Sequence, residues 1–470
     1  MDLTRGTAPD PVRTALPPTR TRRKEPLMTG TDIDVAVVGA GISGLATAFR
    51  LAGTGRSVRV FEACGRVGGR MAGRRHQGYV LDEGAEQIAT SGYDTTWRLI
   101  RAVGLPADAV VPVGGRVAIW RDGRARPDFG HPTGLLTGAG MSWRGRLSWL
   151  RFTATLLRHR RRFDLDHPEA TPLGDATIEE YARRHHRDLY ERLLQPMSGT
   201  FFGWRPERSA IGPMAALLLA VGGAGERWVA YRDGMDTLAR ALADRLDVVT
   251  GNAVVAVEQG PRSGRLDLAD GRTVTAGRVV LAVPAPVALA LHAGVPDDER
   301  PYLAASTYRP MLKVLCLLDR PLPSPTRRPS YGLQVPAVED PVFAGAILDH
   351  IKAPGRVPPG RGLVSLFASP YASTRLLAHT DDEIVSEVRA HAERYLPGLT
   401  EATRTALVAR WPNGLPEAAP AALRLRRAFL DRPLRRVDYA GDWLALRPNS
   451  EAAAHSATLV TRRVLAADAR

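Results

Sequence analysis

Apolar and polar positions near the front of the chain predict a strand, a helix and a second strand. Residues 34–38 form a short β-branched apolar run, which is typical of a buried parallel strand. A helix is predicted from the glycine-rich turn that follows as far as Leu51, and residues 58–61 form a second apolar run. Strands that alternate with helices in this way predict an α/β fold with a parallel sheet.

The turn between the first strand and the helix carries three glycines in the spacing GxGxxG. Gly39, Gly41 and Gly44 permit a tight turn, close approach of the backbone to a pyrophosphate, and close packing of the helix on the strand. Ser43 lies in the same turn, and Glu62 ends the second strand, where its carboxylate can accept hydrogen bonds from ribose hydroxyls. This context predicts a dinucleotide-binding site whose phosphates lie at the helix N-terminus.

A later apolar run, residues 311–318, also has the pattern of a strand, and it contains Lys313. The chain has 64 Lys+Arg, and only three of these residues are lysines. A lysine inside an apolar strand of so arginine-rich a chain indicates a site that needs a compact ammonium instead of a planar guanidinium. The alternative is a structural lysine whose ammonium extends from a strand edge into water.

Composition places the chain among ordinary globular proteins. It has 470 residues, 44% hydrophobic and 24% charged, which excludes disordered and collagen-like classes and allows two or three domains. Two distant cysteines, Cys64 and Cys316, fit a reducing cytoplasm, and no apolar run reaches the roughly 18–20 residues that span a bilayer. The 11 histidines show no metal-ligand spacing, so no metal site is expected. Residues 1–30 lack apolar periodicity and are predicted to be a disordered tail.

The net charge of +15 raises the question of an acidic partner. Residues 141–163 interleave apolar residues with arginines at near-helical spacing, a pattern that membrane-surface helices share with ordinary packing helices. A packing helix is the favoured interpretation, and weak peripheral association with a membrane is the alternative. Nucleic-acid binding is not expected, because the basic residues are spread along the chain and no binding motif occurs.

Two further segments connect the dinucleotide site to a known family. Residues 65–71 read GRVGGRM, shortly after the ribose-binding acid, and residues 439–457 read YAGDWLALRPNSEAAAHSA. Together with the GxGxxG turn, they resemble the flavin-containing amine oxidase and protoporphyrinogen oxidase superfamily of FAD-dependent oxidoreductases. The resemblance covers nearly the whole chain after residue 31, although Ala452 and Ala457 stand where the family pattern has glycines.

The resemblance implies FAD as a noncovalent cofactor, since no cysteine lies near the C-terminus to form a flavin thioether. It implies a Rossmann-type FAD-binding domain with an inserted mixed α+β substrate-binding domain. The expected boundaries are 31–90, 232–290 and 425–470 for the FAD-binding domain, and 91–231 and 291–424 for the substrate-binding domain. The FAD contacts implied beyond the GxGxxG turn and Glu62 are Arg66, Gly68, Gly69, Arg70, Val254, Gly441, Asp442, Glu451, Ala452 and Ala453.

The implied activity is removal of two hydrogens from a small, largely apolar organic substrate, with a hydride passing to flavin N5 and O2 or another acceptor reoxidising the flavin. Residues 192–213 resemble the protoporphyrinogen oxidase branch and favour desaturation of a cyclic or polyunsaturated substrate. Lys313 is the candidate catalytic residue and favours oxidation of an amine to an imine, because amine oxidases of the family use a lysine in this setting to hold a water. Against this, Asn449 stands where those oxidases have an aromatic residue, and Asn449 or Ser450 is expected to cap the last helix. A non-catalytic flavoprotein is the third alternative.

Overall fold

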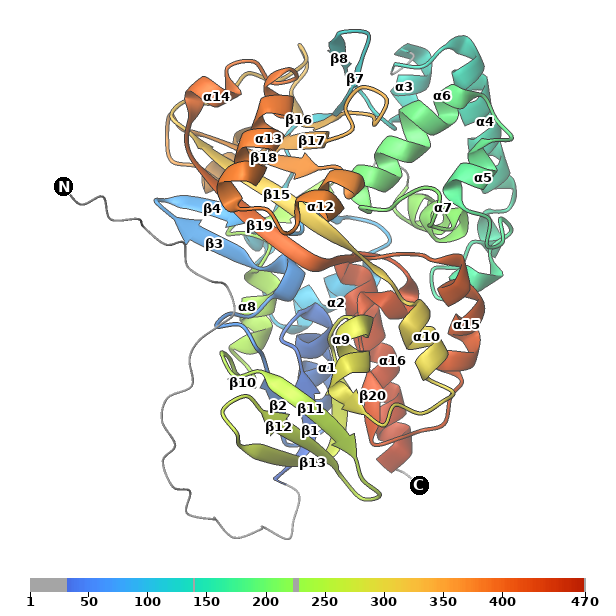
Figure 1. Cartoon of the computed structure of the whole chain (residues 1–470), viewed down its shortest axis with the longest axis vertical. Helices are drawn as coiled ribbons and strands as arrows, with labels where there is room; N and C mark the ends of the chain where they lie inside the picture. Colours follow the sequence, from blue (N-terminus) through green and yellow to red (C-terminus); the bar gives the residue numbers. More distant parts are fainter. Residues whose placement is uncertain (1–31, 138–139, 223–227, 469–470) are drawn as a thin grey trace, which may run out of the picture.

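The computed structural model of the protein describes residues 32–137, 140–222 and 228–468. Two halves lie one above the other in Figure 1, and each is built around one large sheet. The N-terminal tail predicted for residues 1–30 lies outside the described residues.

The first sheet, in the lower half of Figure 1, contains the predicted unit of β1 (Ile33–Val38), α1 (Ile42–Ala52) and β2 (Val58–Phe61). β1 has parallel neighbours on both sides, and its side chains from Val35 to Val38 are at most 5% exposed. A strand buried on both faces requires the continuous apolar run seen in the sequence. The strand order is β10-β2-β1-β13-β12-β11-β14, with β20 beside β13. These further strands are β10 (Asp247–Val249), β11 (Val254–Gln259), β12 (Gly264–Leu268), β13 (Thr273–Leu281), β14 (His292–Ala293) and β20 (Val437–Tyr439).

The strands of this sheet come from three distant stretches of the chain, residues 33–61, 247–293 and 437–439. The C-terminal helix α16 (Ser450–Asp468) and α8 (Thr237–Ala243) both pack against α1. This arrangement supports a discontinuous FAD-binding domain, whose residue boundaries we retain as a proposal.

The second sheet, in the upper half of Figure 1, has the order β19-β15-β18-β17-β16-β7-β8. β15 (Tyr308–Leu318) is the strand predicted around Lys313, and it pairs antiparallel with β18 and β19. α12 (Pro370–Leu376) and α13 (Asp381–Glu393) pack against this sheet. The other strands are β7 (Arg116–Arg121), β8 (Arg124–Arg126), β16 (Ser330–Gln334), β17 (Phe343–Leu348), β18 (Gly362–Ala368) and β19 (Thr403–Pro416).

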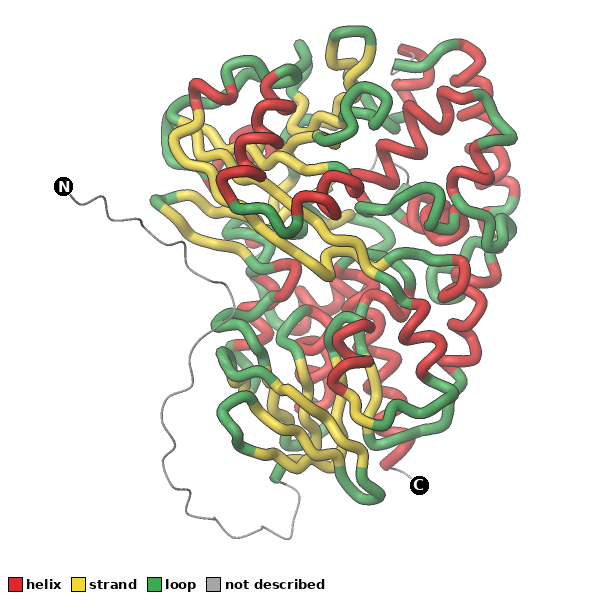
Figure 2. Tube along the Cα trace, viewed as in Figure 1, coloured by secondary structure: helices red, strands yellow, loops and turns green. Residues whose placement is uncertain are grey.

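Shorter strands and a group of helices complete the described chain. β3 (Gly73–His76) pairs with β4 (Tyr79–Asp82), and β9 (Trp228–Tyr231) lies between β5 (Ile88–Ala89) and β6 (Val110–Pro112). The helices at the right of the upper half in Figures 1 and 2 are α3 (Pro132–Thr137), α4 (Trp143–Arg158), α5 (Ile178–Ala182), α6 (Arg187–Leu189) and α7 (Ile211–Ala220). The others are α2 (Asp94–Ala102), α9 (Ala285–Leu291), α10 (Arg300–Ala305), α11 (Asp349–Lys352), α14 (Leu399–Ala402) and α15 (Pro420–Leu430).

The predicted fold class is confirmed. A sheet with a parallel Rossmann-type centre forms one half, and a mainly antiparallel sheet with helices forms the other. Among the described residues, no helix combines the length and the apolar character needed to pass through a lipid bilayer.

Candidate FAD-binding and catalytic site

The GxGxxG turn joins the carboxyl end of β1 to α1, and at one of its glycines the backbone faces unfilled space. Gly39 has φ +103°, and a Cβ there would lie 2.7 Å from the carbonyl oxygen of Ala282. A Cβ on Gly44 would clash with the carbonyl oxygen of Gly39, so this glycine lets α1 pack closely on the turn. A Cβ on Gly41 would meet no atom within 4 Å, and Ser43 lies buried in the first turn of α1. Gly41 therefore faces open space at a helix N-terminus, where backbone N–H groups can bind a phosphate.

The loop of residues 65–71 lies against this turn. The N–H of Gly68 donates to the carbonyl of Ala40 at 2.8 Å, and the two glycines Gly41 and Gly68 form a parallel bridge. A Cβ on Gly69 would lie 3.3 Å from the Cα of Gly41. The structure thus brings together two glycine-rich segments that the sequence predicted to bind the same cofactor.

Glu62 and Arg66 line a pocket of about 280 Å³ beside the turn. The Glu62 carboxylate accepts hydrogen bonds from the N–H groups of Ala40 at 2.7 Å and Cys64 at 2.9 Å, which hold it at the end of β2. Arg66 forms an ion pair with Glu83. The predicted ribose acid therefore lies at the turn as expected, and the contact of Arg66 with a diphosphate remains a prediction.

Arg70 and Asp442 form a bidentate ion pair although 372 positions separate them in the sequence. The two N–O distances are 2.7 and 2.8 Å, and Asp442 is 3% exposed. Burial opposes the charge on Arg70, but Asp442 outweighs that effect and raises the pKa of the guanidinium above its ordinary value. The pair ties the GRVGGRM loop to the segment that follows β20, so two predicted FAD contacts converge.

The C-terminal helix α16 begins at a capped end. The N–H of Ala452 donates to Oδ1 of Asn449 at 2.8 Å, which confirms Asn449 as the cap. The carboxylate of Glu451 accepts hydrogen bonds from the backbone N–H groups of Thr95 at 2.9 Å and Thr96 at 2.8 Å. This carboxylate therefore caps α2, and the contact of Glu451 with FAD remains a prediction.

Four further predicted contact residues flank these elements. Gly441 directly precedes Asp442, and its N–H donates to Oγ of Ser456 at 2.9 Å. Ala452 and Ala453 lie in the first turn of α16, and Val254 begins β11. The structure places Gly441 and the two alanines in one segment after β20. Their contacts with FAD, and that of Val254, remain predictions.

Polar atoms at the start of α16 lack hydrogen-bond partners within the described residues. Arg447 is 1% exposed, and its Nε and Nη1 are unpaired, as is Nδ2 of Asn449. Burial lowers the pKa of Arg447 to about 10. Because a buried hydrogen-bond donor without an acceptor is costly, these donors indicate an acceptor group that the described residues do not supply. FAD is rich in such acceptors, and these donors and the open space at Gly41 fit it.

Lys313 on β15 is fully buried, so the alternative in which its ammonium reaches water from a strand edge is wrong. Its Nζ donates to the backbone carbonyl of Asp82 and to the carboxylate of Glu86. It also lies 5.3 Å from the ring centroid of Phe367. An ammonium has three donors, and partners for two of them lie in the described chain. One donor of Lys313 is therefore left for a water or a ligand.

A second lysine, missed in the sequence, reaches the same cluster. Nζ of Lys352 lies 2.8 Å from the carboxylate of Asp349 and 3.4 Å from that of Asp82, and it also pairs with Glu86. Arg356 pairs with Asp82. With Lys313, three cations and three carboxylates share one buried cluster. The signal that could have found Lys352 is the scarcity of lysine, since two of the three lysines in the sequence lie here.

Burial and ion pairing shift the pKa values of the groups in this cluster in opposite directions. Burial would raise the pKa of Asp82, but the three cations outweigh burial and hold that pKa below its ordinary value. For Glu86 burial exceeds the effect of the two lysines, and its pKa lies above the ordinary value. Burial disfavours the ammonium of Lys352, but the three carboxylates raise its pKa.

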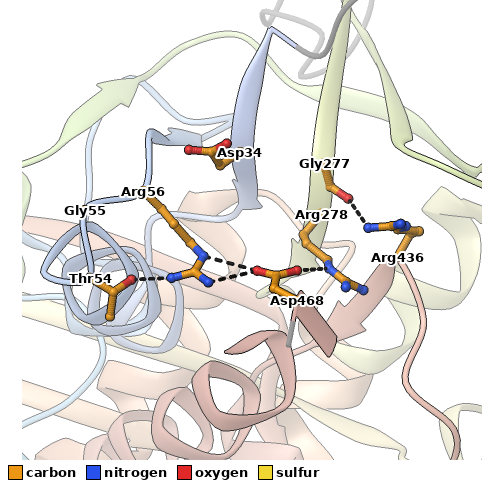
Figure 3. Close-up of a pocket in the computed structure, with 8 residues that line it drawn as sticks. All are labelled: Asp34, Thr54, Gly55, Arg56, Gly277, Arg278, Arg436 and Asp468. Atoms are coloured by element: carbon orange, nitrogen blue, oxygen red, sulfur yellow. Dashed lines mark hydrogen bonds and ion pairs between the residues drawn. The ribbon is translucent and has the colours of Figure 1, made fainter. Parts of the chain in front are cut away.

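Figure 3 shows a larger pocket of about 420 Å³ at the edge of the first sheet where β1 begins. Asp468 of α16 forms ion pairs there with Arg56 at 3.0 Å and with Arg278 at 2.9 Å. Ligands of open α/β sheets bind at the carboxyl ends of the strands, which is the opposite edge. This pocket is therefore not the cofactor site, and its ion pairs fasten the last turn of α16 to the sheet.

Fold and site together define an FAD-dependent oxidoreductase. The profile of the family described as flavin containing amine oxidoreductase matches residues 42–465. The chain belongs to this family, and it is an enzyme that uses FAD.

Relatives and solved structures agree with this assignment. The chain is 25% identical to protoporphyrinogen oxidase 1 of Arabidopsis thaliana, over 83% of this chain and 79% of the relative. It is 26% identical to coproporphyrinogen III oxidase of Propionibacterium freudenreichii, over 87% of each chain. Its fold is similar to a triple mutant of putrescine oxidase, with a TM-score of 0.76 and 18% identity over 93% of this chain and 99% of that one.

Proposed function

We propose that the protein removes two hydrogens from a largely apolar organic substrate, in a desaturation like that of the porphyrinogen oxidases. FAD, when bound, supplies the hydride acceptor for this chemistry, and O2 or another acceptor reoxidises it. The observation that carries the proposal is the charge balance of the buried cluster around Lys313.

An amine substrate that binds as an ammonium is best held by an uncompensated carboxylate or by an aromatic cage. In the described cluster, Asp82, Glu86 and Asp349 are each paired with a cation of the chain. Asn449, where the family's amine oxidases carry an aromatic residue, is the cap of α16. Both features count against a substrate that binds as a cation.

The relatives support the same choice. The two curated relatives described above are named as porphyrinogen oxidases, and each matches more than four-fifths of this chain, at 83% and 87%. A porphyrinogen carries carboxylates at its rim, but its reacting carbons are apolar and it has no cationic group, which suits a site whose carboxylates are already paired.

Within this proposal, four residues of the cluster have distinct tasks. Lys313 holds a water in the site with its remaining donor, and Glu86 fixes the direction of the ammonium. Lys352 pairs with Glu86 from the other side and Asp349 pairs with Lys352, so both are positioning residues. The apolar strand β15 keeps bulk water away from Lys313.

A second candidate function is oxidation of an amine to an imine with O2. It is favoured by the buried placement of Lys313 on β15, eight residues before Pro321, as the resemblance to flavin amine oxidases implies. In that case, the water proposed to bind Lys313 would lie beside the nitrogen of the substrate.

The two candidates are separated by anaerobic reduction of the purified FAD-loaded enzyme. Protoporphyrinogen IX and coproporphyrinogen III are mixed with it in a stopped-flow instrument, and primary amines and polyamines are tested in parallel. We expect a porphyrinogen to bleach the flavin absorbance and the amines to leave it unchanged. Dithionite serves as the control that the flavin is reducible.

Bleaching by an amine and not by a porphyrinogen would establish the second candidate and overturn the first. Bleaching by neither class, with dithionite still effective, would also contradict the desaturation proposal for these macrocycles. The family assignment and the use of FAD would stand in both cases.

A further inference from the structure

Helix α4 exposes an apolar stripe along its whole length. Trp143, Leu147, Leu150 and Leu157 are 65%, 40%, 50% and 55% exposed. At about 100° per residue they fall on one face of the helix. Leu136 of α3, 82% exposed, lies next to this stripe, because its carbonyl accepts a hydrogen bond from Arg146. These five residues are most of the eight large hydrophobic side chains exposed in the described chain.

The orientation of α4 is fixed by its opposite face. Trp149, Phe152 and Leu156 are buried there against the rest of the upper half. Ser142 caps the helix, and a Cβ on Gly145 would press against the side chain of Asp188 at 2.5 Å. The favoured sequence interpretation, a packing helix, is therefore only half of what α4 does. One face packs, and a second apolar face is held outward.

Arginines border the exposed stripe. Arg144, Arg151 and Arg158 each follow a stripe residue by one position, which places them along one edge of it. Arg160–Arg162 extend this edge beyond the helix. From residue 140 to residue 163 the sequence has seven arginines and no Asp or Glu. The guanidinium of Arg144 also lies over the ring of Trp143, with 5.2 Å from Cζ to the ring centroid.

We propose that this face, formed by α4, Leu136 and Arg160–Arg162, docks the protein on the surface of an anionic phospholipid bilayer. The apolar stripe enters the boundary between headgroups and acyl chains, and the arginine edge binds lipid phosphates. α4 lies on the bilayer in this arrangement and does not cross it.

The charge of the face argues against a second copy of the chain as its occupant. A two-fold dimer brings the same patch of both subunits together. The arginine edges of two such patches would then lie close to each other and repel. An anionic lipid surface supplies the opposite charge over the whole length of α4 and an apolar phase beneath it.

The test is sedimentation of the full-length FAD-loaded protein with vesicles. One preparation is phosphatidylcholine alone, and the other contains phosphatidylcholine and phosphatidylglycerol in equal parts. We expect binding to the anionic vesicles to be about tenfold or more tighter than to the neutral ones, and to weaken as salt is added.

Two variants divide the face into its parts. The triple variant Leu147→Ser, Leu150→Ser and Leu157→Ser should weaken binding by about tenfold or more, because the stripe no longer inserts. The double variant Arg151→Gln and Arg158→Gln should weaken binding to anionic vesicles and reduce its salt dependence, since it removes two of the six arginines of the edge. The matched control, Val255→Ser with Val338→Ser, changes two equally exposed apolar residues elsewhere and should bind as the unchanged protein does.

Three results would overturn the proposal. These are no sedimentation with anionic vesicles, unchanged binding by the stripe variant, or equal loss in the control. Analytical ultracentrifugation without lipid tests whether a second copy of the chain binds this face instead. A dimer that the stripe variant dissociates would make the face a contact between two copies and would also overturn the proposal. Circular dichroism and flavin absorbance show that each variant is folded and loaded.

Discussion

Lys313 and Lys352 are buried to the same extent but differ in their surroundings. Lys313 has one donor left over, whereas Lys352 contacts three carboxylates. Lys313→Met should therefore slow flavin reduction or reoxidation by about tenfold or more, because it removes the donor that we propose holds a water. Stopped-flow measurement of both half-reactions, on variant enzyme with its FAD retained, tests this expectation.

Lys352→Met is the matched control for that substitution. Both substitutions remove one ammonium from the same cluster, and breaking such a buried pair costs about 3–5 kcal/mol of unfolding free energy in either case. We expect Lys352→Met to keep the rate within a few-fold of the unchanged enzyme. Equal slowing by both variants would mean that Lys313 acts only through the integrity of the cluster.

Gly41 and Gly44 offer a second comparison at single residues. Gly41→Ala adds a methyl group to open space, so we expect normal folding but FAD binding weakened by about tenfold or more, since the backbone no longer approaches the pyrophosphate. Gly44→Ala forces a clash with the Gly39 carbonyl and should lower the melting temperature. Thermal unfolding and flavin titration of the apoprotein measure both effects. Tight FAD binding by a well-folded Gly41→Ala variant would place the phosphates elsewhere.

At the scale of elements, α2 depends on a side chain from the other end of the sequence. Glu451 satisfies the N–H groups of Thr95 and Thr96 at the start of α2. Glu451→Gln replaces a charged acceptor at this positive helix end with a neutral one and should lower the free energy of unfolding by about 1–2 kcal/mol. Urea unfolding measures the change. Glu258→Gln, on the exposed face of β11, is the control and should have little effect.

The sequence predicted those elements whose position depends on neighbouring residues alone. β1, α1 and β2 follow from an apolar run, three glycines and a terminal acid, and each lies where it was expected. β15 likewise follows from its apolar run. The outward apolar face of α4 was ambiguous, because periodicity shows that a helix has apolar faces but not which of them the fold covers.

For the whole molecule, the sequence predicted two domains but not the buried cluster between their segments. Glu86 and Lys352 are 266 positions apart, and Glu86 and Lys313 are 227 apart, so no local pattern relates them. The cofactor motifs were recognisable because each is a short local pattern of glycines and charged residues. The carboxylates around Lys313 have no motif of their own and become visible only when β4, β15 and α11 have come together.

The ion pair of Arg70 with Asp442 bears on the order of events during synthesis. A ribosome releases the GxGxxG turn and Arg70 first, whereas Asp442 emerges 372 residues after Arg70. Domains generally fold in the order in which they are made, but here the first-made strands belong to a sheet whose last strand, β20, is made near the end. We therefore expect the first sheet, and stable binding of the flavin to it, to be completed only after β20 and Asp442 have left the ribosome.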